Sequence, residues 1–235
     1  MEGHTAMTTP SEIVFLFDCD NTLLDNDRVQ FDLQTHLEQE FGAENRTRYW
    51  EIFEQLRTEL GYADYLGALQ RYRLCAMTDP RLLQMSAFLM DYPFAERLYP
   101  EALDVVAHLG KWGPTVILSD GDVVFQPRKI QRSGLWDAVC GRVLIYIHKE
   151  KMLDDLQQRY PARQYVMVDD KLRILAAMKN VMKERLTTVF PRQGHYARDP
   201  DVIATYPAAD LTVERVCDLI RAMDYREGRL VLSGE

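Results

Sequence analysis

Two aspartates, Asp18 and Asp20, stand two positions apart directly after the apolar run of residues 13–17. In an extended segment, side chains two positions apart project to the same side, so both carboxylates can face one pocket. Two nearby carboxylates repel, which favours a proton on one of them unless a cation intervenes. The pair can therefore supply an ionised nucleophile and a second group that gives and takes a proton.

Three later apolar runs also end in polar side chains. They are residues 115–118 before Ser119, residues 143–147 before His148 and Lys149, and residues 165–168 before Asp169 and Asp170. In an open parallel sheet, ligands bind beyond the carboxyl ends of the strands, where these groups would converge. A third carboxylate, from Asp169, would complete an oxygen-rich site suited to Mg²⁺. Lys149 and the Ser119 hydroxyl would then contact phosphoryl oxygens and offset their charge.

The elements that must position these groups are readable from the apolar pattern. The runs lack period-2 alternation, which is typical of strands covered on both faces in a parallel sheet. A further run at residues 186–190 predicts a fifth strand, and helix-like stretches such as residues 100–109 lie between the runs. This alternation predicts an α/β fold with a doubly wound, mainly parallel sheet.

The interval between the first and second strands has a different pattern. Val29, Leu33, Leu37 and Phe41 recur every four residues and meet Gly42, which predicts an amphipathic helix with a C-terminal stop. Similar helical patterns follow up to residue 90. We therefore predict an all-helical cap over residues 25–94, inserted into a catalytic core of residues 11–24 and 95–235.

Composition limits the class of protein. The 235 residues are 47% hydrophobic and 27% charged, as in a globular protein, and the net charge of −8 argues against a protein that binds nucleic acid through its backbone. No segment approaches the roughly 18 apolar residues of a membrane span. The four cysteines form no CxxC pair, so neither a zinc site nor a disulfide framework is indicated. A soluble, cytoplasmic protein is expected.

Four segments resemble the motifs of the haloacid dehalogenase-like (HAD) hydrolases, in the order and spacing of that family. FLFDCDNTLLD resembles the DxDxT motif, VILSD the second motif, Lys149 in IYIHKE the third-motif lysine, and VMVDD the acidic fourth motif. The resemblance spans about residues 13–190. It implies a Rossmann-like core, and the predicted helical insertion corresponds to the cap that the family calls C1.

The resemblance also implies roles for these residues. Asp18 would attack phosphorus and form an aspartyl-phosphate, and Asp20 would protonate the leaving oxygen and then deprotonate water. Asp18, the backbone carbonyl of Asp20, and Asp169 would hold Mg²⁺, with Asp170 assisting directly or through water. Dehalogenases of the superfamily lack an Asp at the position of Asp20. The expected activity is therefore a Mg²⁺-dependent phosphatase acting on a small phosphorylated metabolite.

Several alternatives stay open at this point. A phosphomutase would use the same residues, a 2-haloacid dehalogenase is less favoured, and a non-catalytic relative would only bind a ligand. Lys151 competes with Lys149 as the phosphate contact, while Lys171 and Arg173 are either pocket cations or surface residues. The roles of Asp120, Asp122, Arg192 and His195, the oligomeric state and the substrate are not readable from the sequence.

Overall fold

A six-stranded parallel sheet forms the centre of the computed structural model, which describes residues 10–74, 78–226 and 228–232. Its order is β3-β2-β1-β4-β5-β6. The strands are β1 (Ser11–Phe17), β2 (Thr115–Asp120), β3 (Val143–Tyr146), β4 (Ala162–Val168), β5 (Leu186–Pro191) and β6 (Leu211–Val213). The chain changes direction across the sheet between β1 and β4, which is where open α/β sheets bind ligands.

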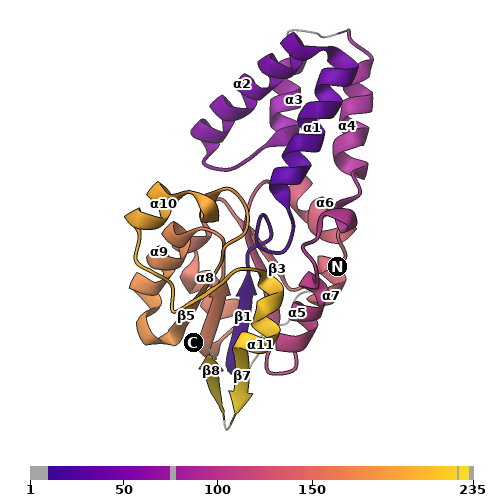
Figure 1. The fold of residues 1–235 in the computed structure, drawn as a ribbon. Coiled ribbons are helices and arrows are strands. Elements are labelled where there is room, and N and C mark those ends of the chain that lie inside the picture. The colour runs from indigo at the N-terminus through magenta and orange to yellow at the C-terminus, as the bar shows by residue number, and fades with distance from the viewer. Residues whose placement is uncertain (1–9, 75–77, 227, 233–235) are drawn as a thin grey trace.

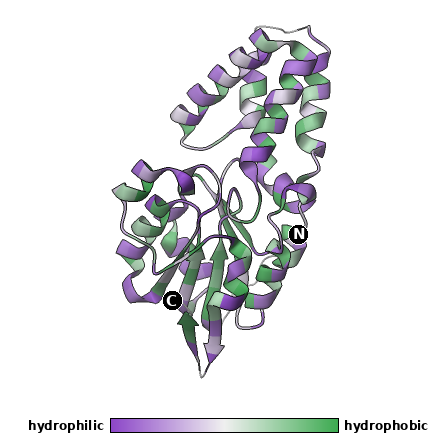
Figure 2. Cartoon of the chain, viewed as in Figure 1, coloured by the Kyte–Doolittle hydropathy of each residue, from purple (hydrophilic) through white to green (hydrophobic). Residues whose placement is uncertain are grey.

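Helices cover both faces of this sheet (Figure 1). Alternate residues of β1 are buried on opposite sides, Phe15 and Phe17 in one apolar cluster and Val14 and Leu16 in the other. Residues 13–17 of the strand are therefore all apolar, in keeping with the mostly green strands of the sheet in Figure 2. The first cluster includes residues of α5 (Ala102–Leu109), α6 (Phe125–Arg132), α7 (Leu135–Ala138) and α11 (Leu219–Ala222). The second includes residues of α8 (Leu153–Arg159) and α9 (Leu172–Met182).

Four helices form an insertion between β1 and the rest of the core, and they make the upper lobe of Figure 1. They are α1 (Asn26–Phe41), α2 (Ala43–Leu60), α3 (Tyr65–Arg73) and α4 (Arg81–Asp91). Asp25 caps α1 by accepting a hydrogen bond from the Arg28 backbone N–H, and Gly61 ends α2 in a left-handed conformation. The predicted helices are confirmed, while the exact division into cap and core at residues 25 and 94 stays a prediction.

The carboxyl ends of the strands meet at the edge of the sheet that faces the insertion (Figure 1). The register pairs Phe17 at the end of β1 with Val168 at the end of β4 and with Ile117 of β2. The residues that follow these strands therefore start from neighbouring positions. The pairing explains at the level of the backbone why the polar groups predicted to converge lie together.

The structure extends the predicted fold in two places. The five predicted strands are present, and β6 adds a sixth, three-residue strand at the edge. The C-terminal segment forms an antiparallel hairpin of β7 (Met223–Arg226) and β8 (Arg229–Leu232), on the side opposite the insertion (Figure 1). Both were missed because three or four residues are too few to show a period. Short 3₁₀ helices and α10 complete the chain, at Phe94–Arg97, Lys149–Lys151, Lys183–Arg185, Tyr196–Arg198, Pro200–Thr205 (α10) and Val216–Asp218.

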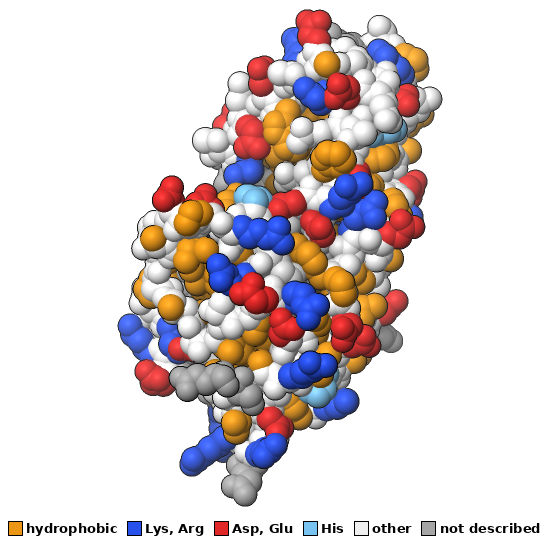
Figure 3. Space-filling model, viewed as in Figure 1, with side chains coloured by type: hydrophobic (Ala, Val, Ile, Leu, Met, Phe, Trp, Pro, Cys, Tyr) orange, Lys and Arg blue, Asp and Glu red, His pale blue; other side chains and the backbone are white. Residues whose placement is uncertain are grey.

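The surface mixes charges of both signs. On the face drawn in Figure 3, basic and acidic side chains are interspersed over both lobes. Among the described helices, none is long and apolar enough to cross a membrane. Cys19, Cys140 and Cys217 are free thiols, and Cys75 lies outside the described residues.

Candidate active site

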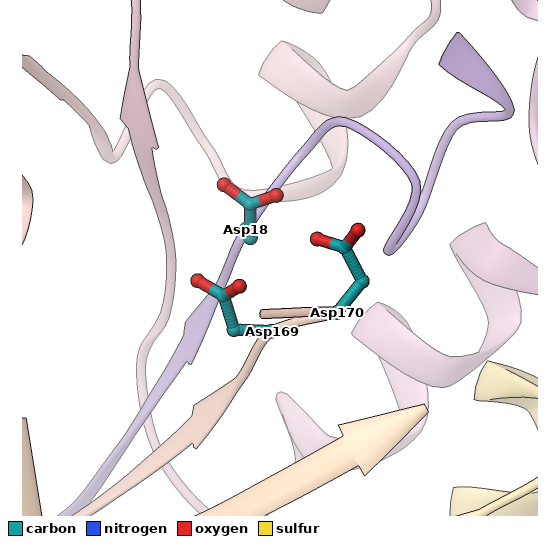
Figure 4. Close-up of side chains that lie close together, drawn as sticks. All are labelled: Asp18, Asp169 and Asp170. Atoms are coloured by element: carbon teal, nitrogen blue, oxygen red, sulfur yellow. The ribbon is translucent and has the colours of Figure 1, made fainter. Parts of the chain in front are cut away.

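Three buried carboxylates meet where β1 and β4 end. Asp18 follows β1, and Asp169 and Asp170 follow β4, so that one carboxylate oxygen of each lies within 4.8 Å of the others. Figure 4 shows the three side chains arranged around a common space. None is more than 3% exposed, so water screens their mutual repulsion very little. Such a cluster needs positive charge close by.

Lys149 supplies part of that charge. Its Nζ lies 2.5 Å from Asp18 Oδ1 and 2.7 Å from Asp169 Oδ2, and it also donates to the Leu118 carbonyl. Asp120 fixes the start of this segment by accepting a hydrogen bond from the Lys149 backbone N–H at 2.7 Å. Lys151, in the same 3₁₀ helix, is exposed. Of the two lysines, the geometry therefore brings Lys149 to the carboxylates.

The charges in the cluster shift one another's pKa values. Burial raises the pKa of Asp18 to about 7, with Lys149 opposing the rise and Asp169 adding to it. Burial raises the pKa of Asp170 well above its usual value, against the opposing charge of Lys171. Burial alone would lower the pKa of Lys149, but Asp169 and Asp18 outweigh it and raise the pKa. Lys149 therefore stays protonated. Its single charge does not balance three carboxylates, so their repulsion destabilises the folded protein unless a further cation binds.

The oxygens of the cluster fit a divalent metal. Within the described chain, Asp18 Oδ2 and both carboxylate oxygens of Asp170 are buried and accept no hydrogen bond. Asp169 is more engaged, since Oδ1 accepts from the Lys171 backbone N–H at 2.8 Å and Oδ2 lies against Lys149. Hard carboxylate oxygens of this kind are the ligands that Mg²⁺ prefers. The direct or water-mediated part expected for Asp170 from the sequence stays a prediction, and its two unpartnered oxygens are compatible with a direct one.

Asp20 is held apart from the cluster by a second buried lysine. Lys129 Nζ donates to both Asp20 oxygens, at 2.7 and 2.9 Å, and to Asn26 Oδ1 at 3.0 Å. Lys129 is only 1% exposed, whereas Asp20 is partly exposed and lines a cavity. The charge-assisted contact with Lys129 therefore fixes the orientation of the Asp20 carboxylate, which also borders the cavity.

Gln126 connects this pair to Ser119. Its Nε2 donates to Ser119 Oγ at 3.0 Å and to Asp20 Oδ2 at 3.3 Å. Ser119 does not cap the next helix, because α6 begins at Phe125 and Asp122 accepts hydrogen bonds from the backbone at its start. The Ser119 hydroxyl therefore accepts a hydrogen bond from the Gln126 side chain and donates a longer one, at 3.3 Å, to the Asp120 carbonyl.

A tight loop after β1 places Asp18 and Asp20 against the other strand ends. Asn21 adopts a left-handed conformation, with φ of 61°, and its side-chain oxygen accepts from the backbone N–H groups of Asn26 and Asp27. Thr22 Oγ1 accepts from the Asp170 backbone N–H at 3.0 Å, which ties the first loop to the fourth. A Cβ at Gly194 would lie 2.5 Å from the Asn21 Cβ, so only glycine allows this approach.

A cavity of about 560 Å³ opens beside this edge of the sheet, between the insertion and the core. The insertion and the loop after β1 supply one wall, and the end of β2 and the segments after β4 and β5 supply the other. Its lining residues are Asn21, Asn26, Gln30, Arg57, Gly61, Tyr62 and Ala63 on one side, Asp120, Lys171, Leu172, Arg173, His195, Tyr196, Asp201, Val202, Thr205 and Tyr206 on the other, and Asp20. Its volume suits a small molecule.

The start of α1 is fastened to the loop after β5. His195 contacts Asp27 through both its backbone N–H, at 2.8 Å, and its ring Nδ1, at 2.6 Å. Burial alone would raise the pKa of Asp27, but hydrogen bonds from His195 and Asn21 outweigh it and lower the pKa. Arg192, the other residue of this loop whose role is not readable from the sequence, pairs with Glu214 instead.

We expect the stabilising effect of the Asp27–His195 pair to disappear in acid. A lowered folded-state pKa stabilises the protein above the ordinary value of 3.8 and stops doing so as the pH falls through the folded-state pKa. Asp27→Asn should cost about 1 kcal/mol or less at pH 7, because the pair is partly solvated, and progressively less as the pH falls below 3.8. Urea unfolding of both proteins at several pH values measures this, and a cost independent of pH would contradict it.

The comparison with protein families agrees with this geometry. The family described as haloacid dehalogenase-like hydrolase matches residues 14–181, a span that contains every group of the site described above except those that follow β5. The chain belongs to the haloacid dehalogenase-like hydrolases. No curated protein is significantly similar to it in sequence.

Solved structures of HAD hydrolases have the same fold. A protein from Burkholderia xenovorans LB400, described as haloacid dehalogenase-like, is 73% identical, with a TM-score of 0.86 over 90% of this chain and 98% of its own. The HAD-hydrolase YfnB from Bacillus subtilis, solved with magnesium, is 15% identical, with a TM-score of 0.58 over 90% and 98%. The L-2-haloacid dehalogenase of Xanthobacter autotrophicus is 20% identical, with a TM-score of 0.56 over 88% and 96%. The last two show the fold alone.

Within this HAD hydrolase, the structure brings Asp18, Lys149, Asp169 and Asp170 into direct contact or close approach. It connects Ser119 to Asp20 through Gln126. Sequence reasoning missed Gln126 and Lys129. They share one face of α6 with Phe125 and Ile130, and a lysine on the apolar face of a helix is the signal that could have revealed them.

Proposed function

We propose that this HAD hydrolase is a Mg²⁺-dependent phosphatase that acts on a small phosphorylated molecule through an aspartyl-phosphate. The observation that carries the proposal is Asp20, a carboxylate in the cavity wall beside the three-carboxylate cluster. An alkoxide leaving from phosphorus needs a proton, whereas a halide ion leaves without one. A residue placed to give that proton therefore favours phosphate esters over haloacids.

In the first step, a carboxylate oxygen of Asp18 forms a bond to phosphorus as the bond to the leaving oxygen breaks. Asp20 enters this step protonated and gives its proton to that oxygen, and the alcohol departs. Lys149 lies against Asp18 and offsets the negative charge of the phosphoryl group brought next to three carboxylates. The Ser119 hydroxyl, which accepts from Gln126, would donate to a phosphoryl oxygen in place of its 3.3 Å contact with the Asp120 carbonyl.

In the second step, water attacks the same phosphorus. Asp20, now ionised, takes the proton of the water, and the bond between phosphorus and Asp18 breaks. Inorganic phosphate leaves and both aspartates return to their initial states. Lys129 holds the Asp20 carboxylate in place for both proton transfers, because its Nζ contacts both oxygens.

Asp18 and Asp170, with Asp169 beside them, would hold the Mg²⁺. Their unpartnered oxygens support this assignment, as does the excess of carboxylates over Lys149. When bound, Mg²⁺ supplies positive charge that stabilises the phosphoryl oxygens during transfer.

Phosphate release tests the proposal directly. The protein would be assayed with p-nitrophenyl phosphate and a panel of phosphorylated metabolites, with Mg²⁺ and with EDTA. We expect inorganic phosphate release that EDTA abolishes. Isomerised phosphate esters without phosphate release would show a phosphomutase, and halide release from 2-haloacids a dehalogenase; either result would overturn the proposal.

Mg²⁺ should also stabilise the fold in the absence of substrate. A ligand at about 100 times its dissociation constant contributes roughly 2.7 kcal/mol, which for a chain of this size raises Tm by roughly 5–10 °C. Asp170→Asn should lose most of this shift, whereas the control Asp154→Asn, at an exposed position, should keep it. Differential scanning calorimetry with Mg²⁺ and with EDTA measures both. Equal shifts in the two variants would place the ion elsewhere.

A further inference from the structure

The residues that line the cavity indicate which chemical class of leaving group this site accepts. Asp20, the proposed proton donor to the leaving oxygen, lies in its wall, so the rest of the substrate must extend into the cavity. The other wall residues therefore contact the leaving group. Their charges decide what that group can be, and this inference rests on the proposed phosphatase activity.

Most of the charged groups in the wall already have partners. Lys129 pairs with Asp20, and Asp120 accepts from the Lys149 backbone. His195 contacts Asp27, and Arg173 Nη1 lies 3.2 Å from Glu150. Asp201 is exposed on α10 and is solvated. These groups leave little net charge for a ligand to meet.

Lys171 and Arg57 are different. For Lys171, no ion pair is found within the described ranges, although its charge acts on the nearby Asp170, and its Nζ lies 5.3 Å from the centre of the Tyr196 ring. Arg57, from the insertion, donates to the Tyr196 hydroxyl at 3.0 Å. Its nearest carboxylate, Glu54, is 3.6 Å away and both side chains are at least 40% exposed, so this pair contributes little. Two cations from opposite walls thus meet at one tyrosine.

Tyr196 orients these cations rather than receiving an aromatic ligand. Its ring is already in contact with the His195 ring, with centroids 3.9 Å apart, and with the Lys171 ammonium. Its hydroxyl accepts from only one of the five N–H groups of the Arg57 guanidinium. The remaining N–H groups and the Lys171 ammonium are available to an anion.

We propose that the substrate carries a second anionic group on its leaving alcohol, a carboxylate or a phosphate, which Arg57 and Lys171 bind from the two walls. The phosphoryl group to be transferred lies at the carboxylate cluster, beside Asp20, and the second anion lies in the cavity, at Tyr196. Arg57 is then a specificity-determining residue, since it contacts the substrate away from the reacting atoms.

Three matched substrates test this. They are 3-(phosphonooxy)propanoate, the analogue in which an uncharged primary amide replaces its carboxylate, and propane-1,3-diyl bisphosphate. We expect kcat/KM to be about 10- to 100-fold higher for at least one of the two second anions than for the amide, as for a charge-assisted contact that the amide cannot make. Preference for the acid identifies a carboxylate, and preference for the bisphosphate identifies a phosphate.

Arg57→Gln should reduce this preference about tenfold, mainly by raising KM for the preferred anion, and Arg57→Lys should restore part of it. Arg46→Gln is the matched control, because Arg46 lies on the same helix, pairs with Glu38 and is outside the cavity lining. It should keep the full preference. Calorimetric Tm values for all variants exclude a general loss of folding.

Two results would overturn the inference. One is a wild-type kcat/KM for the amide equal to those of both anionic substrates, and the other is an equal fall for all three substrates in Arg57→Gln. Release from p-nitrophenyl phosphate, which has no second anion, reports the proposed phosphatase chemistry separately. If p-nitrophenyl phosphate is hydrolysed in a Mg²⁺-dependent way but the protein shows no preference among the three substrates, the inference is overturned and the proposed function still stands.

Discussion

Asp18→Asn should reduce phosphate release at least about 10⁴-fold with Mg²⁺ saturating, because an amide cannot form the bond to phosphorus. The expected loss is large because the neighbouring carboxylates have other roles, and Asp170, whose oxygens have no hydrogen-bond partner, would hold the Mg²⁺. Asp169 is engaged by Lys149 and by the Lys171 backbone, and Asp20 is held by Lys129. Initial rates with p-nitrophenyl phosphate measure the effect.

The fold should survive this change, which makes the result interpretable. Asparagine has the same shape as aspartate, and it removes a buried charge whose pKa burial has already raised to about 7. A calorimetric Tm near that of the wild type is the control. Acid-quenched wild-type protein should carry labelled phosphate from substrate, and the variant should carry none. Activity retained in Asp18→Asn would mean that water or another group attacks phosphorus directly.

The sequence was sufficient for the parts of the site that lie on strand ends. Each apolar run of four or more residues stops at a group that the structure places at the same edge of the sheet, as with Asp18 after β1 and Asp169 after β4. This works because parallel strands buried on both faces are near-continuous apolar runs, so the polar group that ends such a run marks the edge. The order and spacing of these groups along the chain, which resemble those of the HAD hydrolase motifs, gave a second reason to assign them to one site.

Groups that reach the site from helices were not predictable in the same way. Lys129 is about 110 positions from Asp20 in sequence, and only the packing of α6 against the sheet brings its Nζ to that carboxylate. Arg57 and Tyr196 are likewise 139 positions apart and meet only because the insertion lies over the core. The sequence contains no local signal for such contacts, since they depend on how separate elements pack.

Lys149 offsets the negative charge of the cluster, and this matters both for the stability of the fold and for the chemistry. Its Nζ contacts two of three buried carboxylates, and its side chain is 2% exposed. Removal of one partner from a buried pair leaves an uncompensated charge, which typically costs about 3–5 kcal/mol. The same removal takes away the positive charge next to the attacking carboxylate, so we expect kcat to fall as well.

Lys149→Met should therefore lower the free energy of unfolding by about 3–5 kcal/mol at pH 7 in EDTA, measured by urea denaturation. Lys151→Met, on the same 3₁₀ helix but exposed, should change it by about 0.5 kcal/mol or less. The penalty should shrink towards pH 5. Without the lysine the pKa of Asp18 rises further above 7, so the folded state binds protons that the unfolded state has released, and acid relieves the repulsion. Equal penalties for the two lysines, or a penalty that grows in acid, would show that Lys149 does not neutralise the cluster.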